Sequence, residues 1–507
     1  MPNLKEGSVI EWSYKIISPY FMYVDDVVVQ YEIPVKNFEA RVQLLEWFYF
    51  NKRQKGYYFF KMNESSKSNI DLRTNDRLIE INEKNIPAIK EEPYINNINN
   101  YTAALQLEVA SLSAPTLGLF ETYATSWEEI AKNIYKSSSF GGELGKTGHL
   151  KDDLAILKSK LTTNEAKIGG ALDYVKSNIK WNGNYGIYTE KGGRKSYNEN
   201  TGNVGDINLT LVNVLSELGL KANPVLVSTR SHGIPIFPTS RGFNYVIAAV
   251  EIDGGIHLLD ATNHFSTPNV LPVRALNWQG RLVRENGTSA PIELFPKEQA
   301  KENVFAALTI DSEGLLTGKV RTSYTNQLAL NYRESRNSLT EDELIEKLES
   351  NFSGVEITKV ELQNKEDLYK PLIVNLEFEA EDMIETIGDK IYVSPLVFFA
   401  KSENPFKLDK REYPIDFGTP WNEKHAINIA LPEGYAIESI PESISLALPD
   451  NLGSFKFLCK QNGTTLQVLS EIEINTPIIG ANNYEIIKGF YKMIIDKQQE
   501  KVVLSKN

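Results

Sequence analysis

The sequence Gly202-Asn203-Val204-Gly205-Asp206 leads directly into the most apolar helical pattern of the 507-residue chain, at residues 207–218. Its apolar positions cover most of a helix circumference, so we expect this helix to be buried at the centre of a domain. Asp206 stands where its carboxylate can accept hydrogen bonds from amides of the first turn, and Gly219 is typical of a helix end. The apolar positions are Leu209, Leu211, Val212, Val214, Leu215 and Leu218.

A capped helix and a long loop precede this apolar segment, and strands follow it. Thr162-Thr163-Asn164-Glu165 has the spacing of a capping box, and the helix that it opens runs toward Trp181. Residues 182–203 are rich in Gly and Asn, and loops of that length inside a compact domain are usually functional or disordered. Strands are predicted at residues 224–227, 245–252 and 257–259, the last two joined by a hairpin turn at Asp253-Gly254-Gly255.

Both ends of the chain show the period-two alternation of β-strands. In residues 9–16, the bulky side chains Ile10, Trp12, Tyr14 and Ile16 fall on one face. Alternating segments return beyond residue 290, where one helix begins at the capping box Thr340-Glu341-Asp342-Glu343. A last apolar helix precedes a closing strand at residues 502–504.

These patterns predict an α+β protein in four parts. A β-rich domain is expected at residues 1–105 and a mixed core at 106–288. A β-rich domain with one helix follows at 289–400, and a second β-rich domain, ending in helix and strand, at 401–507. The alternation in the β-rich parts is typical of antiparallel sandwich-like domains.

Composition excludes several classes of protein. The single cysteine, Cys459, rules out an intramolecular disulfide and a cysteine-rich zinc site. The chain has 54 Lys and Arg against 66 Asp and Glu, and a net charge of −12 lacks the overall footprint of a nucleic-acid-binding protein. No apolar run approaches the ~20 residues of a transmembrane helix, and the N-terminal residues lack the apolar region of a signal peptide. Composition leaves the compartment open.

Four motifs around the apolar helix follow the order of a known family. They are Trp181-Asn182-Gly183, Gly202-Asn203-Val204-Gly205-Asp206, Phe243-Asn244-Tyr245-Val246 and Leu258-Leu259-Asp260-Ala261-Thr262. In this layout the chain resembles the transglutaminase-like core of the papain-related thiol enzymes. Its flanking β-rich blocks resemble the domains around this core in a bacterial multidomain family, which is largely of unknown function and often described as proteases. The resemblance covers nearly the whole chain and implies a papain-like core between sandwich-like β domains.

The chemistry of such a core needs three side chains in the order Cys, His, Asp. The cysteine stands at the N-terminus of the buried helix, where the dipole and a neighbouring imidazolium lower the thiol pKa. The histidine acts as base and acid, and the aspartate fixes its tautomer. The resemblance places Val204, Tyr245 and Asp260 at these three positions. A valine cannot attack a carbonyl, and a phenol with a pKa of about 10 is a poor base at neutral pH, so we expect a degenerate triad and no thiol catalysis.

Few other residues offer substitute chemistry. Cys459 lies in a strand-like segment and is predicted to be a small buried side chain. His232 follows the strand at residues 224–227, in a loop that can approach the old active-site cleft. His257, Asp260 and His264 are close in sequence, but His257 and Asp260 fall on opposite faces of a regular strand. No metal site and no cofactor are therefore predicted.

The residues around the degenerate triad form a candidate cleft, comprising Trp181, Tyr185, Asp206 and Asn244. Trp181 matches a family position at the cleft wall, and the aromatic loop after it is suited to a peptide or a glycan. The alternatives are a core tryptophan and a mobile surface loop. Asp206 is expected to cap the buried helix, and Asp260 to accept a hydrogen bond from Tyr245 in place of the imidazole.

Three functions stay open on these grounds. The first is an inactive transglutaminase-like protein that binds or scaffolds a protein, peptide or glycan, in the periplasm or cell envelope of a bacterium as the resemblance implies. The second is an active cysteine-protease-like hydrolase, amidase or acyl transferase with a nucleophile foreign to the family. The third is a purely structural spacer. Residues 4–11 resemble a segment well inside the family's N-terminal β domain, and its members usually begin with an export signal, so an N-terminal truncation is expected.

Overall fold

The computed structural model describes residues 24–123, 126–239, 241–352, 354–381 and 383–506, together with residues 5, 13–18 and 20. The protein is α+β with mainly antiparallel sheets, as the sequence predicts. Contacts divide the chain into two compact units, Met1–Lys90 with Asn99–Thr125 and Glu91–Ile98 with Ser126–Asn507. Among the described residues, no helix is long and apolar enough to cross a membrane.

The first unit consists of two antiparallel sheets around a shared apolar core. Buried side chains from both sheets, among them Phe50, Ile81 and Leu105, form one cluster. Of the strand predicted at residues 9–16, residues 9–12 lie outside the described part, and residues 13–16 form no strand. One sheet contains β1 (Val27–Val28), β6 (Ala104–Ala114), β3 (Phe48–Lys55) and β7 (Leu119–Thr122), and the other β2 (Val35–Leu44), β5 (Thr74–Ile86) and β4 (Met62–Asn69).

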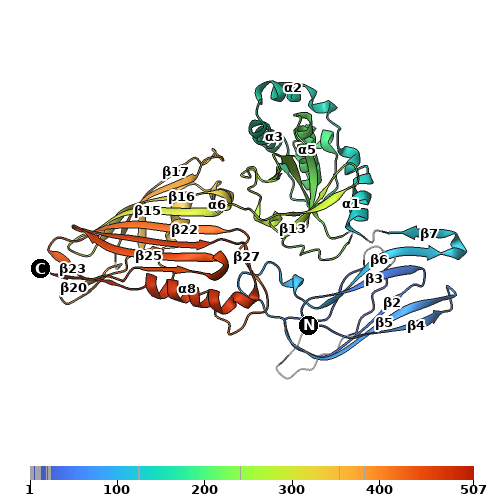
Figure 1. Cartoon of the computed structure of the whole chain (residues 1–507), viewed down its shortest axis with the longest axis horizontal. Helices are drawn as coiled ribbons and strands as arrows, with labels where there is room; N and C mark the ends of the chain where they lie inside the picture. The colour runs from blue at the N-terminus through green and yellow to red at the C-terminus, as the bar shows by residue number, and fades with distance from the viewer. Residues whose placement is uncertain are drawn as a thin grey trace. The chain divides into compact units, whose positions relative to one another are not determined.

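The second unit begins with a lobe in which helices cover a five-stranded antiparallel sheet (Figure 1). The helix α5 (Val204–Glu217) packs on the central strands of this sheet, and α3 (Asn164–Asn178) packs on α5. The predicted hairpin at Asp253-Gly254 is present, with positive φ angles of 50° and 73°. The strand order is β12 (Gly255–Leu259), β11 (Tyr245–Ile252), β10 (Ala222–Val227), β13 (Gln279–Val283) and β14 (Ser289–Glu293).

Two helices of this lobe, α3 and α5, begin close to their predicted caps. Ser126 caps α1 (Trp127–Lys136) by accepting from the amide of Glu129, and α2 (Lys151–Lys160) follows. Thr163, rather than the predicted Thr162, caps α3 through the amide of Ala166. The helix α5 begins at Val204, three residues before the predicted start, because Asn203 takes the cap position.

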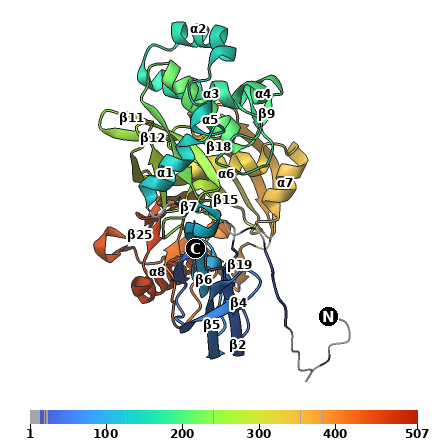
Figure 2. The same ribbon diagram turned by 90° about the vertical axis from the view of Figure 1, so that its right-hand side faces the viewer.

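The predicted loop at residues 182–203 contains short elements of its own. The strand β8 (Lys180–Trp181) leads into the loop and pairs with β9 (Thr201–Gly202) at its end. Between them lies α4 (Gly193–Asn198), which packs against α5. Figure 2 shows α4 and β9 next to α5. The loop is therefore folded onto the start of the buried helix.

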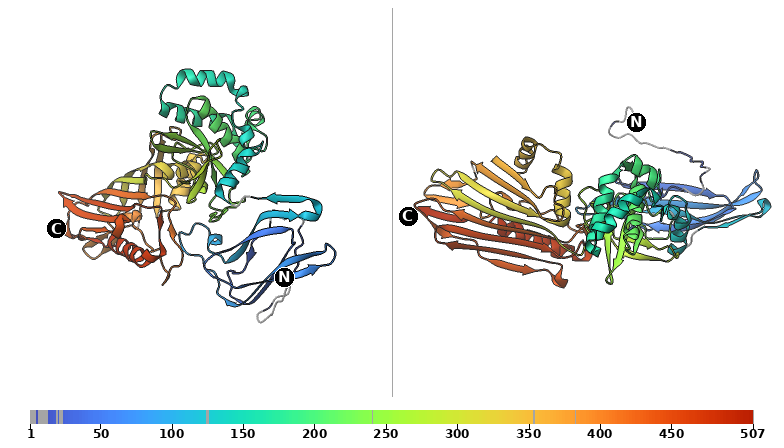
Figure 3. Two further views of the ribbon diagram at one scale, coloured as in Figure 1. Left: turned by 45° about the vertical axis from the view of Figure 1, so that its right-hand side comes forward. Right: turned by 90° about the horizontal axis from the view of Figure 1, so that it is seen from above.

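One eight-stranded sheet extends across the predicted boundary at residue 400 (Figure 3). It is antiparallel except where the third and fourth blocks of the sequence meet, because β15 and β22 pair in parallel. The order is β17 (Val355–Gln363), β18 (Leu372–Ala380), β16 (Leu316–Tyr324), β15 (Ala300–Ile310), β22 (Trp421–Ala430), β26 (Thr465–Ile474), β25 (Gly453–Asn462) and β24 (Ile444–Ala447).

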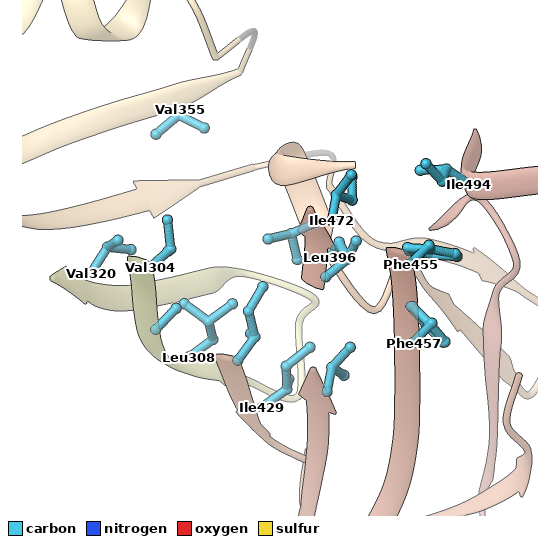
Figure 4. Packing of buried hydrophobic residues seen from close by; sticks show 14 of the residues in the cluster. Val304, Leu308, Val320, Val355, Leu396, Ile429, Phe455, Phe457, Ile472 and Ile494 are labelled. Carbon is cyan, nitrogen blue, oxygen red and sulfur yellow. The ribbon is translucent and has the colours of Figure 1, made fainter. Parts of the chain in front are cut away.

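A second, four-stranded sheet and a helix share the core of the large sheet. Apolar side chains such as Leu308, Phe457 and Ile494 pack together there (Figure 4). The predicted final helix and strand are present as α8 (Tyr484–Gln498) and β28 (Val502–Lys506). The block at residues 289–400 contains two α-helices instead of the predicted one. The helix α6 (Asn326–Arg336) precedes the predicted helix, α7 (Glu341–Glu349). The small sheet contains β19 (Glu385–Ile387), β20 (Lys390–Val393), β28 and β23 (Tyr435–Ser439).

Candidate functional site

The start of α5 is closed by a reciprocal pair of hydrogen bonds. Oδ1 of Asn203 accepts from the amide of Asp206 at 2.8 Å, and Oδ2 of Asp206 accepts from the amide of Asn203 at 3.1 Å. Asp206 is fully buried, and its Oδ1 also accepts from the amide of Gly192 at 2.9 Å. Asp206 therefore satisfies amides at the helix start as expected, but from the third helical position.

Val204 occupies the first position of α5 and has no solvent exposure. Its amide donates to the carbonyl of Asn184 at 3.3 Å, so the loop lies directly over the helix start. At the next residue, Gly205, a Cβ atom would stand 2.4 Å from the carbonyl oxygen of Tyr188. Only glycine permits this close approach of loop and helix, and Val204 presents no reactive atom to solvent.

The hydroxyl of Tyr245, at the start of β11, donates to Oδ2 of Asp260 at 2.7 Å. This hydrogen bond confirms the predicted one, and both residues are fully buried. Thr262 Oγ1 donates to the other carboxylate oxygen of Asp260 at 2.8 Å. Arg274 donates to both hydroxyls, from Nε to Tyr245 at 3.2 Å and from Nη2 to Thr262 at 2.8 Å. The two hydroxyl oxygens also lie 2.6 Å apart, where either can donate to the other. Two hydroxyl groups thus connect a guanidinium to a carboxylate.

This network fixes the protonation of Tyr245. Burial, followed by the charge of Asp260, raises the pKa of the Tyr245 hydroxyl well above its ordinary value. The phenol therefore stays protonated at neutral pH and cannot act as a general base.

Asn208 joins the helix to the same carboxylate. It lies one turn after Val204 on the same face of α5. Its Nδ2 donates to Oδ1 of Asp260 at 3.0 Å and to the carbonyl of Val246 at 2.8 Å. Its Oδ1 accepts from the amide of Ala261 at 2.9 Å. Asn208 therefore joins α5 to the point where the start of β11 and the residues after β12 meet.

Aromatic rings lie beside this point. The Tyr185 ring lies 5.9 Å from that of Tyr245 and 5.5 Å from that of Trp181, measured between centroids. The guanidinium carbon of Arg274 lies 4.5 Å from the Trp181 centroid, a cation–π distance. Tyr185 is 45% exposed, so it is half-exposed above the buried Tyr245.

Asn244 of the predicted cleft and Tyr197 of the aromatic loop have structural partners. Asn244 accepts from the amide of Thr229 and donates to its hydroxyl, both at 2.9 Å, and so holds the end of β10. The hydroxyl of Tyr197 donates to Asp153 of α2 at 2.6 Å, apart from the Trp181 and Tyr185 pair. The structure therefore gathers Trp181 and Tyr185 at the site but gives Asn244 and Tyr197 scaffolding contacts.

A serine and a histidine meet in the loop after β10. Ser228 Oγ lies 2.9 Å from Nδ1 of His232, but it also donates to the carbonyl of Gly233 at 2.6 Å. Because Ser228 has a single hydroxyl proton, Nδ1 of His232 is the donor in their contact. Ser228 is also only 1% exposed. The pair lacks the base-to-nucleophile hydrogen bond of a serine hydrolase.

The remaining candidates take part in other contacts. Cys459 is 4% exposed in β25, as predicted, and burial raises its pKa to about 11. His257 contacts Asn269, and His264 lies 4.0 Å from Glu366. Within the described residues, no group of three or more His, Cys, Asp or Glu side chains is placed to hold a metal ion.

Three residues of the network were not singled out from the sequence. Asn208 carries a usable signal, since a buried amide in an otherwise apolar helix needs a partner. Thr262 lies within the quoted Leu258–Thr262 motif but without an assigned role. Arg274 stands in a short 3-10 turn, Val273–Ala275, and no spacing or composition in that segment predicts its contacts.

Comparison with known proteins supports the fold. The family described as a domain of unknown function with a solved structure (DUF3858) matches residues 389–504. The chain is similar to the crystal structure of a putative protease from Parabacteroides distasonis. The TM-score is 0.55 and the identity 13%, over 95% of this chain and 74% of that one. At this identity the similarity shows a shared fold. No protein among those with curated records matches the chain.

Proposed function

We propose that this chain is a catalytically inactive transglutaminase-like protein, whose core binds or scaffolds a partner in the bacterial cell envelope. One observation carries the proposal. The positions that the resemblance assigns to the nucleophile and the base hold Val204 and Tyr245, and both are fully buried. Thiol chemistry needs an accessible thiolate beside an imidazole, and neither group exists there. The protease-like neighbour supports the fold alone.

The geometry also explains why the old site is retained. Asp260 now accepts from Tyr245, Thr262 and Asn208 and thereby joins the helix α5 to the sheet edge. A carboxylate left without these donors inside the protein would be strongly destabilising. On this proposal the three positions serve as a structural joint, and the partner surface is the aromatic loop beside them. Tyr185 and Tyr188 are 45% and 41% exposed there, and exposed aromatic rings suit peptide or glycan ligands.

A structural spacer is the second candidate, favoured by contacts between the core lobe and the sheet that follows it. Glu334 of α6 accepts from Nδ2 of Asn263 at 3.0 Å. The hydroxyl of Tyr369 lies 2.8 Å from the position that a Cβ would take at Gly169 of α3. These contacts join the lobe to the sheet that follows it and involve no residue of the candidate cleft.

The first experiment tests inactivity. The purified 507-residue chain is screened with fluorogenic peptide and amide substrates, beside the Ser228→Ala and Cys459→Ala variants. The expected result is no turnover above that of buffer in any sample, with a papain-type enzyme as the positive control. Turnover by the wild type that disappears in Ser228→Ala would overturn the proposal and identify the nucleophile.

The second experiment separates a binding module from a spacer. The wild type is applied to peptide and glycan arrays, together with Tyr185→Ala and the matched control Ile156→Ala, which removes a 51%-exposed side chain of α2. A binding module predicts a ligand class that Ile156→Ala retains and Tyr185→Ala loses. Equal binding by all three proteins, or by none, would support the spacer.

A further inference from the structure

A second site lies on the solvent-facing side of the eight-stranded sheet. Val304, Ala306 and Leu308 of β15 are buried, whereas Phe305, between the first two, is 53% exposed. Since successive side chains of a strand point to opposite faces, Phe305 stands on the side opposite the core. A cavity of about 310 Å³ lies there, lined by residues of β15, β16, β18 and β22. We call it the sheet pocket, and its volume is at the lower end of the range of small-molecule sites.

Two alanines beside Phe305 form the floor of the sheet pocket. Ala426 lies opposite Phe305 on the parallel strand β22, and Ala307 follows Phe305 on the same face of β15. A methyl group rises much less from a sheet than a phenyl ring does. The Phe305 ring therefore rises beside a low apolar floor.

Polar side chains of β16 and β18 line the sheet pocket next to this floor. Nη1 of Arg321 lies 3.4 Å from Oδ1 of Asn375, and Nζ of Lys319 pairs with Oε1 of Glu377 at 3.2 Å. The Lys319 and Glu377 side chains are 74% and 40% exposed. Exposed ion pairs contribute little net free energy, and a hydrogen bond of 3.4 Å is long. These four groups can therefore turn their donors and acceptors to a ligand at little cost.

Charges of both signs surround the sheet pocket and nearly cancel. On the three neighbouring rows of side chains that cross β16, β18 and β17, three cations face four carboxylates. The cations are Lys319, Arg321 and Lys359, and the carboxylates are Glu356, Glu361, Glu377 and Glu379. On the other side, Lys424 of β22 lies 4.0 Å from Glu471. A charged ligand would therefore gain little from this field, whereas a neutral ligand with several hydroxyl groups can use donors and acceptors alike.

The backbone beneath the sheet pocket is already used. The strands β15, β16, β18 and β22 each pair with a strand on either side. Their amides and carbonyls are therefore occupied by the ladders. An extended peptide cannot add to the sheet at this point, so a ligand must be recognised through side chains.

We propose that the sheet pocket binds a neutral glycan. A pyranose ring presents a face of C–H groups and a rim of hydroxyl groups. The Phe305 ring and the alanine floor suit the C–H face. Arg321, Asn375 and Glu377 suit the rim, because a hydroxyl group both donates and accepts. This inference goes beyond the proposed function, since it needs no residue of the core lobe.

The test is an array of neutral oligosaccharides of glucose, xylose, mannose and galactose, with oligogalacturonate as the acidic probe. The labelled 507-residue chain is applied at several concentrations, so that apparent affinities can be compared. At least one neutral oligosaccharide should bind, and Phe305→Ala should weaken that binding about tenfold. Ala307→Leu, which fills the floor at an exposed strand position, should weaken it as well. Both variants should keep the circular dichroism spectrum of the wild type.

Phe120→Ala is the matched control, because it removes a phenylalanine that is 75% exposed on β7. Tyr185→Ala tests the core lobe in the same assay. The proposal requires that both variants bind as the wild type does. Binding to no neutral oligosaccharide would overturn it, and so would an equal affinity for oligogalacturonate or equal losses in Phe120→Ala and Phe305→Ala. A loss in Tyr185→Ala alone would assign the glycan to the core lobe and overturn the proposal too.

Discussion

The hydroxyl of Tyr245 donates to Oδ2 of Asp260 at 2.7 Å, in a region without solvent exposure. Arg274 completes the arrangement from the other side, because its Nε donates to the same hydroxyl at 3.2 Å. The contact therefore connects the half-buried guanidinium of Arg274 to the buried carboxylate of Asp260 through a neutral hydroxyl. Such an arrangement keeps both charges solvated inside the protein, and it makes the hydroxyl a structural requirement.

Tyr245→Phe is expected to lower the free energy of unfolding of the core lobe by about 1–3 kcal/mol. The ring remains, but one oxygen of Asp260 and Nε of Arg274 lose their partner in a buried place. Chemical denaturation followed by tryptophan fluorescence measures the effect, since Trp181 lies beside Arg274. Tyr185→Phe is the matched control and should be neutral, because that side chain is 45% exposed. Equal stability of both variants would show that the network contributes nothing.

Gly205→Ala is expected to destabilise the lobe, although alanine is the better helix former by about 1 kcal/mol. The new Cβ would stand 2.4 Å from the carbonyl oxygen of Tyr188, so the loop at residues 182–190 must move. Limited proteolysis should show faster cleavage in that loop. Gly148→Ala is the control, since nothing lies within 4 Å of its Cβ position. Loop cleavage at the wild-type rate in Gly205→Ala would contradict the predicted clash.

Local patterns predicted the fold where the relevant contacts are local. The apolar stripe identified α5, the capping boxes identified α3 and α7, and Asp253-Gly254 identified the hairpin between β11 and β12. The boundary at residue 400 has no such support, because β15 pairs in parallel with β22 across more than a hundred residues. Alternation reveals a strand but not its partner.

In the candidate site, too, residues in recognisable motifs were predicted, whereas those that depend on tertiary contacts were not. The resemblance located Val204, Tyr245 and Asp260, and ordinary hydrogen-bond chemistry then predicted the contact between the last two. Arg274 escaped prediction because its role depends on tertiary contacts to Tyr245, Thr262 and Trp181. The N-cap of α5 is Asn203 and not the predicted Asp206. The side chains of these two residues, three positions apart, each accept a hydrogen bond from the backbone amide of the other.

Cys459 is expected to be inert in the native protein. Burial raises its pKa to about 11, so at pH 8 only about one thiol in a thousand is ionised. A chromogenic disulfide reagent should label the native chain slowly, and label one thiol per chain at once in denaturant. Rapid stoichiometric labelling of the native protein would contradict this and reopen the question of thiol chemistry at this position.

Glu302 is expected to make the stability of the large sheet fall as the pH rises. It lies on β15 opposite Glu423 of β22, and burial, followed by the charge of Glu423, raises its pKa to about 7 from an ordinary 4.5. The folded state therefore holds the proton more tightly than the unfolded state does. The stability that this tighter proton binding supplies is fully present below about pH 4.5. It is lost as the pH rises through about 7.

Glu302→Gln removes this titration and should stabilise the protein relative to the wild type at pH 8 but not at pH 4.5. The difference grows across that window to at most about 3 kcal/mol, from 1.36 kcal/mol per pKa unit. Urea unfolding monitored at several pH values measures it. Glu356→Gln, an exposed change on β17, should leave the pH profile of the wild type unaltered. Parallel profiles for Glu302→Gln and the wild type would show that Glu302 ionises freely and that its burial against Glu423 has no energetic consequence.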